Sequence, residues 1–134
     1  MNRILALFAL TLLVACANTE QQENIVRQNN AVEDYIASAE LTEIDAIKAR
    51  GQISHKEITE KHVILQDSRN VYLATFHRRC RELRPENLQP DYRQDANTIR
   101  ARFDTYRGCR IERLFKLSEG QETELIQLGK TSQQ

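Results

Sequence analysis

The sequence predicts a small α+β protein with one antiparallel sheet of about four to five strands, short N- and C-terminal helices and one disulfide. Three observations lead to this fold class. The chain has 134 residues, a length that suits a single domain. Two apolar segments, residues 62–66 and 71–76, flank a group of turn-forming residues, as the two strands of a hairpin do. Helix-capping patterns occur near both ends of the chain.

The composition excludes several classes of protein. The 19 Lys and Arg residues balance 19 Asp and Glu residues, so we expect no nucleic-acid binding through bulk charge. Two Pro and four Gly residues exclude a collagen-like or Pro/Gly-rich disordered chain. The charges are unevenly placed, because residues 17–67 contain ten acids and five bases whereas residues 78–113 contain ten of the fourteen arginines. These two halves neutralise each other across a sheet or simply face water, and the alternative is a dedicated anion site.

The first segment is a predicted signal peptide over residues 1–15. Arg3 precedes an apolar run of twelve residues, which is shorter than the roughly 20 that span a membrane. Leu13-Val14-Ala15-Cys16 resembles the lipobox of bacterial lipoprotein signals. We therefore expect cleavage before Cys16, a diacylglyceryl group on its thiol and an acyl chain such as palmitate on its amine. The alternative is an ordinary secretory signal in which Cys16 is incidental.

The lipid determines the expected location. Two or more acyl chains give lasting anchorage, so the membrane is the first expected partner. In Gram-negative lipoproteins an Asp after the lipidated cysteine commonly retains the protein in the inner membrane, so Ala17 indicates the periplasmic face of the outer membrane by analogy with that class. Residues 16–29 are polar and predict a flexible tether, followed by one domain over 30–129 and a frayed tail over 130–134.

The domain is expected to begin with a helix over 31–38. Asn30 and Glu33 have the spacing of a capping box. One helical face carries the apolar side chains Val32, Tyr35, Ile36 and Ala39. A strand is then expected over 41–48, and Ser54 with Glu57 predicts a single capped turn before Ile58.

The hairpin is the clearest element. Residues 67–70 form its turn, and a register centred on this turn places Ile64 opposite Leu73. Both faces of the pair are then apolar, so we expect it at the centre of the sheet with cover on each side.

A second antiparallel pair is predicted from residues 98–104 and 109–117. In the first strand Ile99, Ala101 and Phe103 alternate with polar residues and are expected to face inward. A last helix is expected to begin after Ser118, which forms a capping box with Gln121, and to end at Gly129. Its apolar stripe consists of Leu125, Ile126 and Leu128.

Cys80 and Cys109 are expected to form a disulfide. With Cys16 lipidated, they are the remaining pair in a chain exported to the oxidising periplasm. A redox site usually has Cys-x-x-Cys spacing, which is missing from the sequence. No metal pattern surrounds the cysteines, and we expect neither a metal nor another cofactor.

Four segments resemble a family of small exported proteobacterial proteins, many of them lipoproteins, classed as a domain of unknown function. The segments are residues 61–66, 70–83, 99–104 and 108–114. They contain the paired apolar hairpin, the Tyr72-Leu73 strand that ends before a cysteine and a leucine, the Arg102-Phe103-Asp104 strand and the second cysteine followed by Ile111. The resemblance covers residues 31–118. It implies no catalytic or binding residues, because the family has no established activity.

Enzymatic function is not expected. Glu60 and His77 would lie opposite each other at the strand ends, where a surface ion pair is the simpler explanation than acid–base catalysis. His62 and Asp104 are the other polar candidates, and neither belongs to a catalytic motif.

The sequence favours a non-enzymatic accessory or interaction protein of the cell envelope with an unidentified envelope partner. The alternative is an anion-binding module for lipid phosphate, cell-wall carboxylate or an acidic protein. Its candidate residues are Arg84, Arg100, Arg102 and Arg110. Asp104, Glu112 and Glu82 could instead neutralise these arginines within the domain.

Overall fold

The computed structural model describes residues 2–49, 51–83 and 98–131, with the backbone alone for residues 2–18 and 82. It contains two long helices, α1 (Asn2–Ser38) and α2 (Glu119–Thr131), and a short 3-10 helix, η1 (Arg81–Leu83). The strands are β1 (Glu43–Ile44), β2 (Ala46–Lys48), β3 (Ser54–Thr59), β4 (His62–Gln66), β5 (Val71–Phe76), β6 (Thr98–Arg100), β7 (Thr105–Tyr106) and β8 (Cys109–Leu117). The predicted α+β class, with its antiparallel sheet, two terminal helices and disulfide, is confirmed.

The predicted hairpin lies in the middle of the main sheet. The strand order is β1-β8-β5-β4-β3, and β7 also pairs with β8. Ile64 lies opposite Leu73 in the β4–β5 pair, which is the predicted register. On its other side β5 pairs with β8, so Leu73 also lies opposite Phe115.

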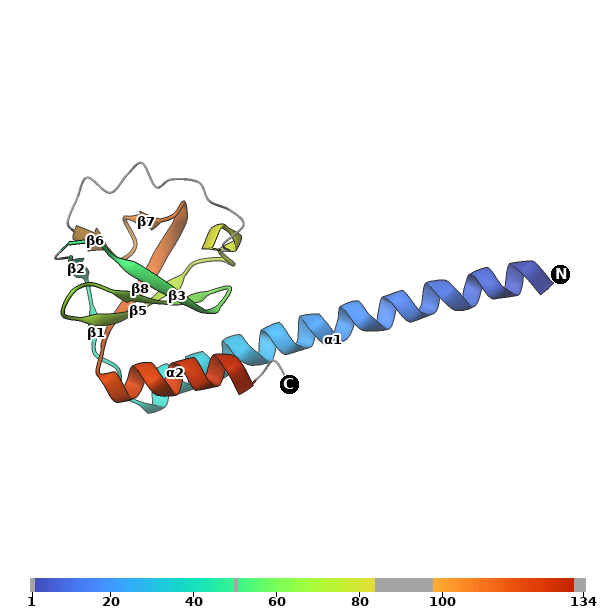
Figure 1. Cartoon of the computed structure of the whole chain (residues 1–134), viewed down its shortest axis with the longest axis horizontal. Coiled ribbons are helices and arrows are strands. Elements are labelled where there is room, and N and C mark those ends of the chain that lie inside the picture. Colours follow the sequence, from blue (N-terminus) through green and yellow to red (C-terminus); the bar gives the residue numbers. More distant parts are fainter. Residues whose placement is uncertain (1, 50, 84–97, 132–134) are drawn as a thin grey trace.

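Two apolar clusters cover the two faces of this sheet. On one face Ile64, Leu73 and Phe115 pack with side chains of α1 and α2. The other face carries the larger cluster, which includes Val63, Ala74, Leu114 and both disulfide-bonded cysteines. The expectation of cover on both sides of the hairpin is therefore confirmed. Figure 1 shows α2 and the C-terminal part of α1 side by side below the sheet, while α1 continues far beyond the domain.

The N-terminal helix is much longer than predicted. It was expected over 31–38, and the structure has one continuous helix from Asn2 to Ser38. Residues 16–29, predicted to be a flexible tether, lie within it. The apolar period used for the prediction begins at Val32 because this is where the helix becomes fully buried against the sheet. Residues 19–31 are helical without such burial, which a search for an apolar face does not detect.

The C-terminal helix confirms its predicted start and corrects its predicted end. The backbone N–H of Ser118 donates to Gln121 Oε1 at 2.9 Å, and the Gln121 N–H donates to Ser118 Oγ at 3.4 Å, as in a capping box. Gly129 does not end the helix, which continues to Thr131. A Cβ atom at Gly129 would lie 3.0 Å from the carbonyl oxygen of Ile58, so this glycine allows α2 to approach β3 closely.

The structure corrects three predictions about strands and turns. The single turn expected from Ser54 is strand β3, at the edge of the sheet against β4. The predicted pairing of residues 98–104 with 109–117 is present only in part. Strand β6 ends at Arg100 and pairs with β2 in a separate two-stranded sheet, whereas Arg102 and Asp104 form backbone hydrogen bonds with Ile111 and the following strand β7 pairs with β8. The strand expected over 41–48 is accordingly divided into β1, which pairs with β8, and β2, which pairs with β6.

Candidate functional site

Cys80 and Cys109 form the predicted disulfide. Their Cα atoms are 5.7 Å apart, and both residues are almost fully buried. The bond joins the segment after β5 to the first residue of β8. Both cysteines belong to the larger apolar cluster, so the bond lies in the core and is placed to stabilise the fold.

The four arginines predicted to bind an anion, here called the arginine face, are only partly brought together. Arg102 Nη2 lies 3.4 Å from Glu43 Oε1. The Arg110 guanidinium donates to the Arg102 carbonyl through Nε at 3.2 Å and through Nη2 at 2.8 Å. Arg100 is exposed at the end of β6, and its guanidinium has no ion pair among the residues that the structure describes. Arg84 lies outside the described residues.

The segment from Arg100 to Asp104, here called the Arg-Phe turn, differs from its prediction. Phe103 was expected to face inward and instead has 82% of its surface exposed. Alternation ends because the chain reverses direction, with the Asp104 N–H donating to the Arg100 carbonyl at 3.1 Å. Arg102 has a φ of 68°, a left-handed conformation that costs a non-glycine residue about 1–2 kcal/mol.

A row of four polar side chains crosses the helix-covered face of the sheet. Thr59 of β3 lies opposite His62 of β4, His62 lies opposite Thr75 of β5, and Thr75 lies opposite Arg113 of β8. This polar row is largely covered, since Thr59, His62 and Thr75 are all buried. Polar groups buried in a small core require partners, and α1 supplies two of them.

Asn29 and Glu33 of α1, one helical turn apart, lie over the polar row. Glu33 Oε1 is 3.0 Å from His62 Nε2, and Glu33 Oε2 is 2.5 Å from Arg113 Nη2. The Thr59 hydroxyl donates to Asn29 Oδ1 at 2.7 Å, and its oxygen also lies 2.7 Å from His62 Nδ1. The guanidinium of Arg113 in addition lies over the Phe115 ring, 5.3 Å from its centre. Contacts between ionised and polar groups thus hold α1 on the sheet.

Burial and hydrogen bonding act in opposite directions on the two titratable groups of this network. Burial lowers the pKa of His62, and it outweighs the hydrogen bond to Glu33, which favours the charged ring. Burial by itself would raise the pKa of Glu33, but the hydrogen bonds from His62 and Arg113 leave that pKa below its usual value. Arg113 and Lys61 also oppose a charge on His62.

The network has the connectivity of an acid–base relay, in which a hydroxyl, an imidazole and a carboxylate follow one another. His62 is fully buried and the exposed fraction of Thr59 is only 5%. A substrate therefore cannot reach the hydroxyl while α1 is in place. The geometry suits the attachment of the helix better than it suits nucleophilic catalysis.

The stability of the protein is expected to fall as the pH decreases from 7.5 to 5.5. In the unfolded chain His62 titrates near its usual pKa of about 6.5, whereas the folded state resists protonation, so acid favours unfolding in this interval. Chemical denaturation at several pH values measures the dependence. In His62→Gln the slope should be smaller than in the parent, and burial also lowers the pKa of His55, so the comparison between parent and variant is the informative one. Equal slopes would contradict a neutral, buried His62.

Sequence reasoning singled out His62 but assigned it no partner. Glu33 was interpreted as a capping residue and Arg113 was given no role, because no local spacing connects positions 33, 62 and 113. The available signal was a histidine at the start of an apolar strand that is buried on both faces. The other expected pair does not form as predicted: Glu60 is 3.6 Å from Arg79, and His77 is 3.9 Å from Glu112.

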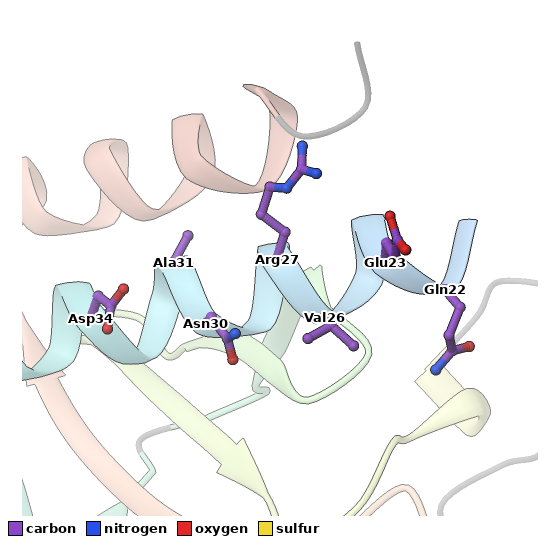
Figure 2. Close-up of a pocket in the computed structure, with 7 residues that line it drawn as sticks. All are labelled: Gln22, Glu23, Val26, Arg27, Asn30, Ala31 and Asp34. Carbon is purple, nitrogen blue, oxygen red and sulfur yellow. The ribbon is translucent and has the colours of Figure 1, made fainter. Parts of the chain in front are cut away.

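The surface of α1 carries a shallow hollow of about 520 Å³. Figure 2 shows its lining, which consists of Gln22, Glu23, Val26, Arg27, Asn30, Ala31 and Asp34. All seven belong to one helix, so the hollow is an open helix surface and not an enclosed site. A second open groove of about 640 Å³ lies between Tyr35 of α1 and the outer side of α2.

Two further observations concern metals and membranes. Within residues 2–49, 51–83 and 98–131 there is no group of three His, Cys, Asp or Glu side chains that could hold a metal ion. Among the helices of the described chain, none has a stretch long and apolar enough to cross a membrane. Cys16 lies in α1, where the backbone alone is described.

Together these features define a class: a small disulfide-bonded α+β domain whose long N-terminal helix is attached to the sheet through apolar contacts and a partly buried polar network. The chain belongs to a family of unknown function, DUF6491, whose model matches residues 1–132. No curated protein and no solved structure matches the chain.

Proposed function

We propose that this protein is a lipid-anchored accessory protein of the bacterial cell envelope that acts through contacts with an envelope partner and not through catalysis. The observation that carries the proposal is the continuity of α1. The same helix contains Cys16, the expected lipidation position, and Asn29 and Glu33, which hold the domain. At 1.5 Å per residue, the 13 residues from Cys16 to Asn29 correspond to about 20 Å of helix. Such an element suits the presentation of a domain at a fixed height above a membrane.

A second observation supports a non-enzymatic role. The polar row contains the groups best arranged for acid–base chemistry in the described chain, and α1 covers them. A site that is closed by the anchor helix itself is better suited to maintaining the shape of the protein than to turnover.

Cys16→Ala is expected to abolish lipidation and membrane retention, because the Cys80 and Cys109 thiols are joined to each other. Labelling with a fatty acid, followed by fractionation of the envelope, measures both effects. Asn18→Ala, two residues further along the chain, is the matched control and should label like the parent. Continued labelling and unchanged membrane partition of Cys16→Ala would contradict the lipoprotein assignment.

The alternative function is anion binding by the arginine face, and fewer arginines support it than the sequence predicted. The Arg102 guanidinium pairs with Glu43, and the Arg110 guanidinium donates to the Arg102 carbonyl. Arg100 is the predicted anion ligand with an exposed guanidinium that forms no ion pair among the described residues. One guanidinium can recognise a carboxylate but does not by itself surround a phosphate.

A further inference from the structure

The Arg-Phe turn presents an aromatic ring to solvent. Phe103 is 82% exposed, and the other exposed large apolar side chain in the described chain is Val26, at 45%. A single exposed apolar residue is common on protein surfaces and indicates nothing by itself. The way in which the chain holds Phe103 is the informative feature.

The backbone around Phe103 is fixed by hydrogen bonds on several sides. The Arg100 N–H donates to Asp104 Oδ2 at 2.7 Å, and the Arg102 N–H donates to the Ile111 carbonyl at 2.9 Å. The two bonds from the Arg110 guanidinium hold the Arg102 carbonyl. Phe103 is therefore held outward by its surroundings and is not exposed merely because the loop is loose.

The same turn contains backbone strain. Arg102 is left-handed at a φ of 68°, and Arg107, in the next turn, is left-handed at 49°. Strained residues persist where their surroundings over-determine them, and such places are frequently ligand or partner contacts. Exposure of an apolar ring and strain thus coincide in one tightly bonded turn.

The charges around the ring favour a protein over a flat anionic membrane. Asp104 accepts the Arg100 N–H, and Arg102 is paired with Glu43. The carboxylates of Asp104 and Glu43 thus offset two of the three guanidiniums at the turn, those of Arg100, Arg102 and Arg110. One net positive charge gives little long-range attraction toward a lipid surface. What remains is the directional Arg100 guanidinium beside one aromatic ring, and Arg and aromatic residues dominate the energetics of protein–protein contacts.

We propose that the Arg-Phe turn docks into an envelope protein, with Phe103 filling an apolar pocket and Arg100 pairing with a carboxylate at the rim of that pocket. This inference rests on the proposed function and specifies the partner's chemistry. Figure 1 shows β6 and β7, which flank the turn, on the side of the domain away from α2 and far from the N-terminal end of α1. The turn thus lies away from the part of α1 on which the lipid anchor is expected.

The test is photo-crosslinking of the full-length chain in cells that produce it. The photoreactive amino acid p-benzoylphenylalanine replaces Phe103, and in a matched control it replaces the exposed Glu119 at the start of α2. We expect one discrete protein adduct from position 103 and none from position 119. Mass spectrometry of the crosslinked peptide should place the bond at apolar partner residues adjacent to Asp or Glu.

Reversing the charge of Arg100 tests whether the partner recognises this guanidinium. Arg100→Glu should reduce its yield at least tenfold, whereas Lys116→Glu, at an exposed position of β8, should leave it unchanged. Thermal unfolding shows whether Arg100→Glu remains folded, and Arg100→Gln replaces it if it does not. No adduct, a lipid adduct, an adduct with a second copy of this chain or a yield that is insensitive to Arg100 would each overturn the proposal. Membrane partition in the same samples reports separately on the lipid anchor, so failure of one inference is distinguishable from failure of the other.

Discussion

Leu73→Ala is expected to lower the free energy of unfolding by about 2–5 kcal/mol, because it removes buried methyl groups and leaves a cavity. Leu73 has no exposed surface and lies between Ile64 and Phe115 on the two neighbouring strands. Leu73 lies on the sheet face that the helices cover, so solvent-exposed side chains can fill little of the cavity. Urea denaturation of the parent and the variant measures the difference.

The matched comparison is the double variant Arg100→Gln and Arg102→Gln. These side chains are exposed, and an ion pair such as Arg102–Glu43 contributes about 0–1 kcal/mol. The double variant should therefore unfold close to the parent. A loss as large as that of Leu73→Ala would show that the arginines are committed to the fold, and the anion-binding alternative would fail.

Replacing both Cys80 and Cys109 by Ser is expected to cost about 3.5 kcal/mol, within the usual range of about 2–5 kcal/mol. The two residues are 29 positions apart, and the bond restricts the unfolded chain by closing that loop. Because both positions are buried, two serine hydroxyls add a desolvation cost in the same direction. Thermal or urea unfolding of the double variant measures the loss.

Reduction of the parent protein provides the control for this variant, since it removes the bond without changing the side chains. The reduced parent and the double variant should have similar unfolding midpoints. Each single Cys→Ser variant should expose one free thiol after denaturation without reductant. Two free thiols in the unreduced parent would show that the bond is not formed.

The part of the fold that was predictable is the part determined by neighbours in sequence. Apolar residues on both sides of a four-residue turn determine the β4–β5 register, and the Ser118 and Gln121 spacing determines where α2 begins. The disulfide was predictable for a different reason, because elimination of Cys16 leaves a single pair. Each of these inferences needs only short-range chemistry or counting.

The errors arise where tertiary contacts override a local pattern. The alternation of residues 98–104 is real, yet the chain turns after Arg100 because Asp104 and Arg110 bind its backbone. Gly129 has the composition of a helix end, but its role depends on Ile58, which is distant in sequence. The polar row was hidden for the same reason, since Glu33 meets His62 and Arg113 only after β4 and β8 have been brought together by β5.

The helix is continuous from Cys16 to Glu33, so the number of residues between these positions determines how the domain is rotated relative to Cys16. An α-helix turns about 100° and rises 1.5 Å with each residue. With an anchor at Cys16, one residue inserted before Asn29 would rotate the domain by about 100° around the helix axis. Four inserted residues would bring it back to within about 40° of its original orientation and move it about 6 Å along the axis. A coil of the same length would absorb either insertion. The direction in which the Arg-Phe turn faces thus depends on the number of residues in α1 between Cys16 and the domain. Insertions or deletions in this segment rotate the turn around the helix axis.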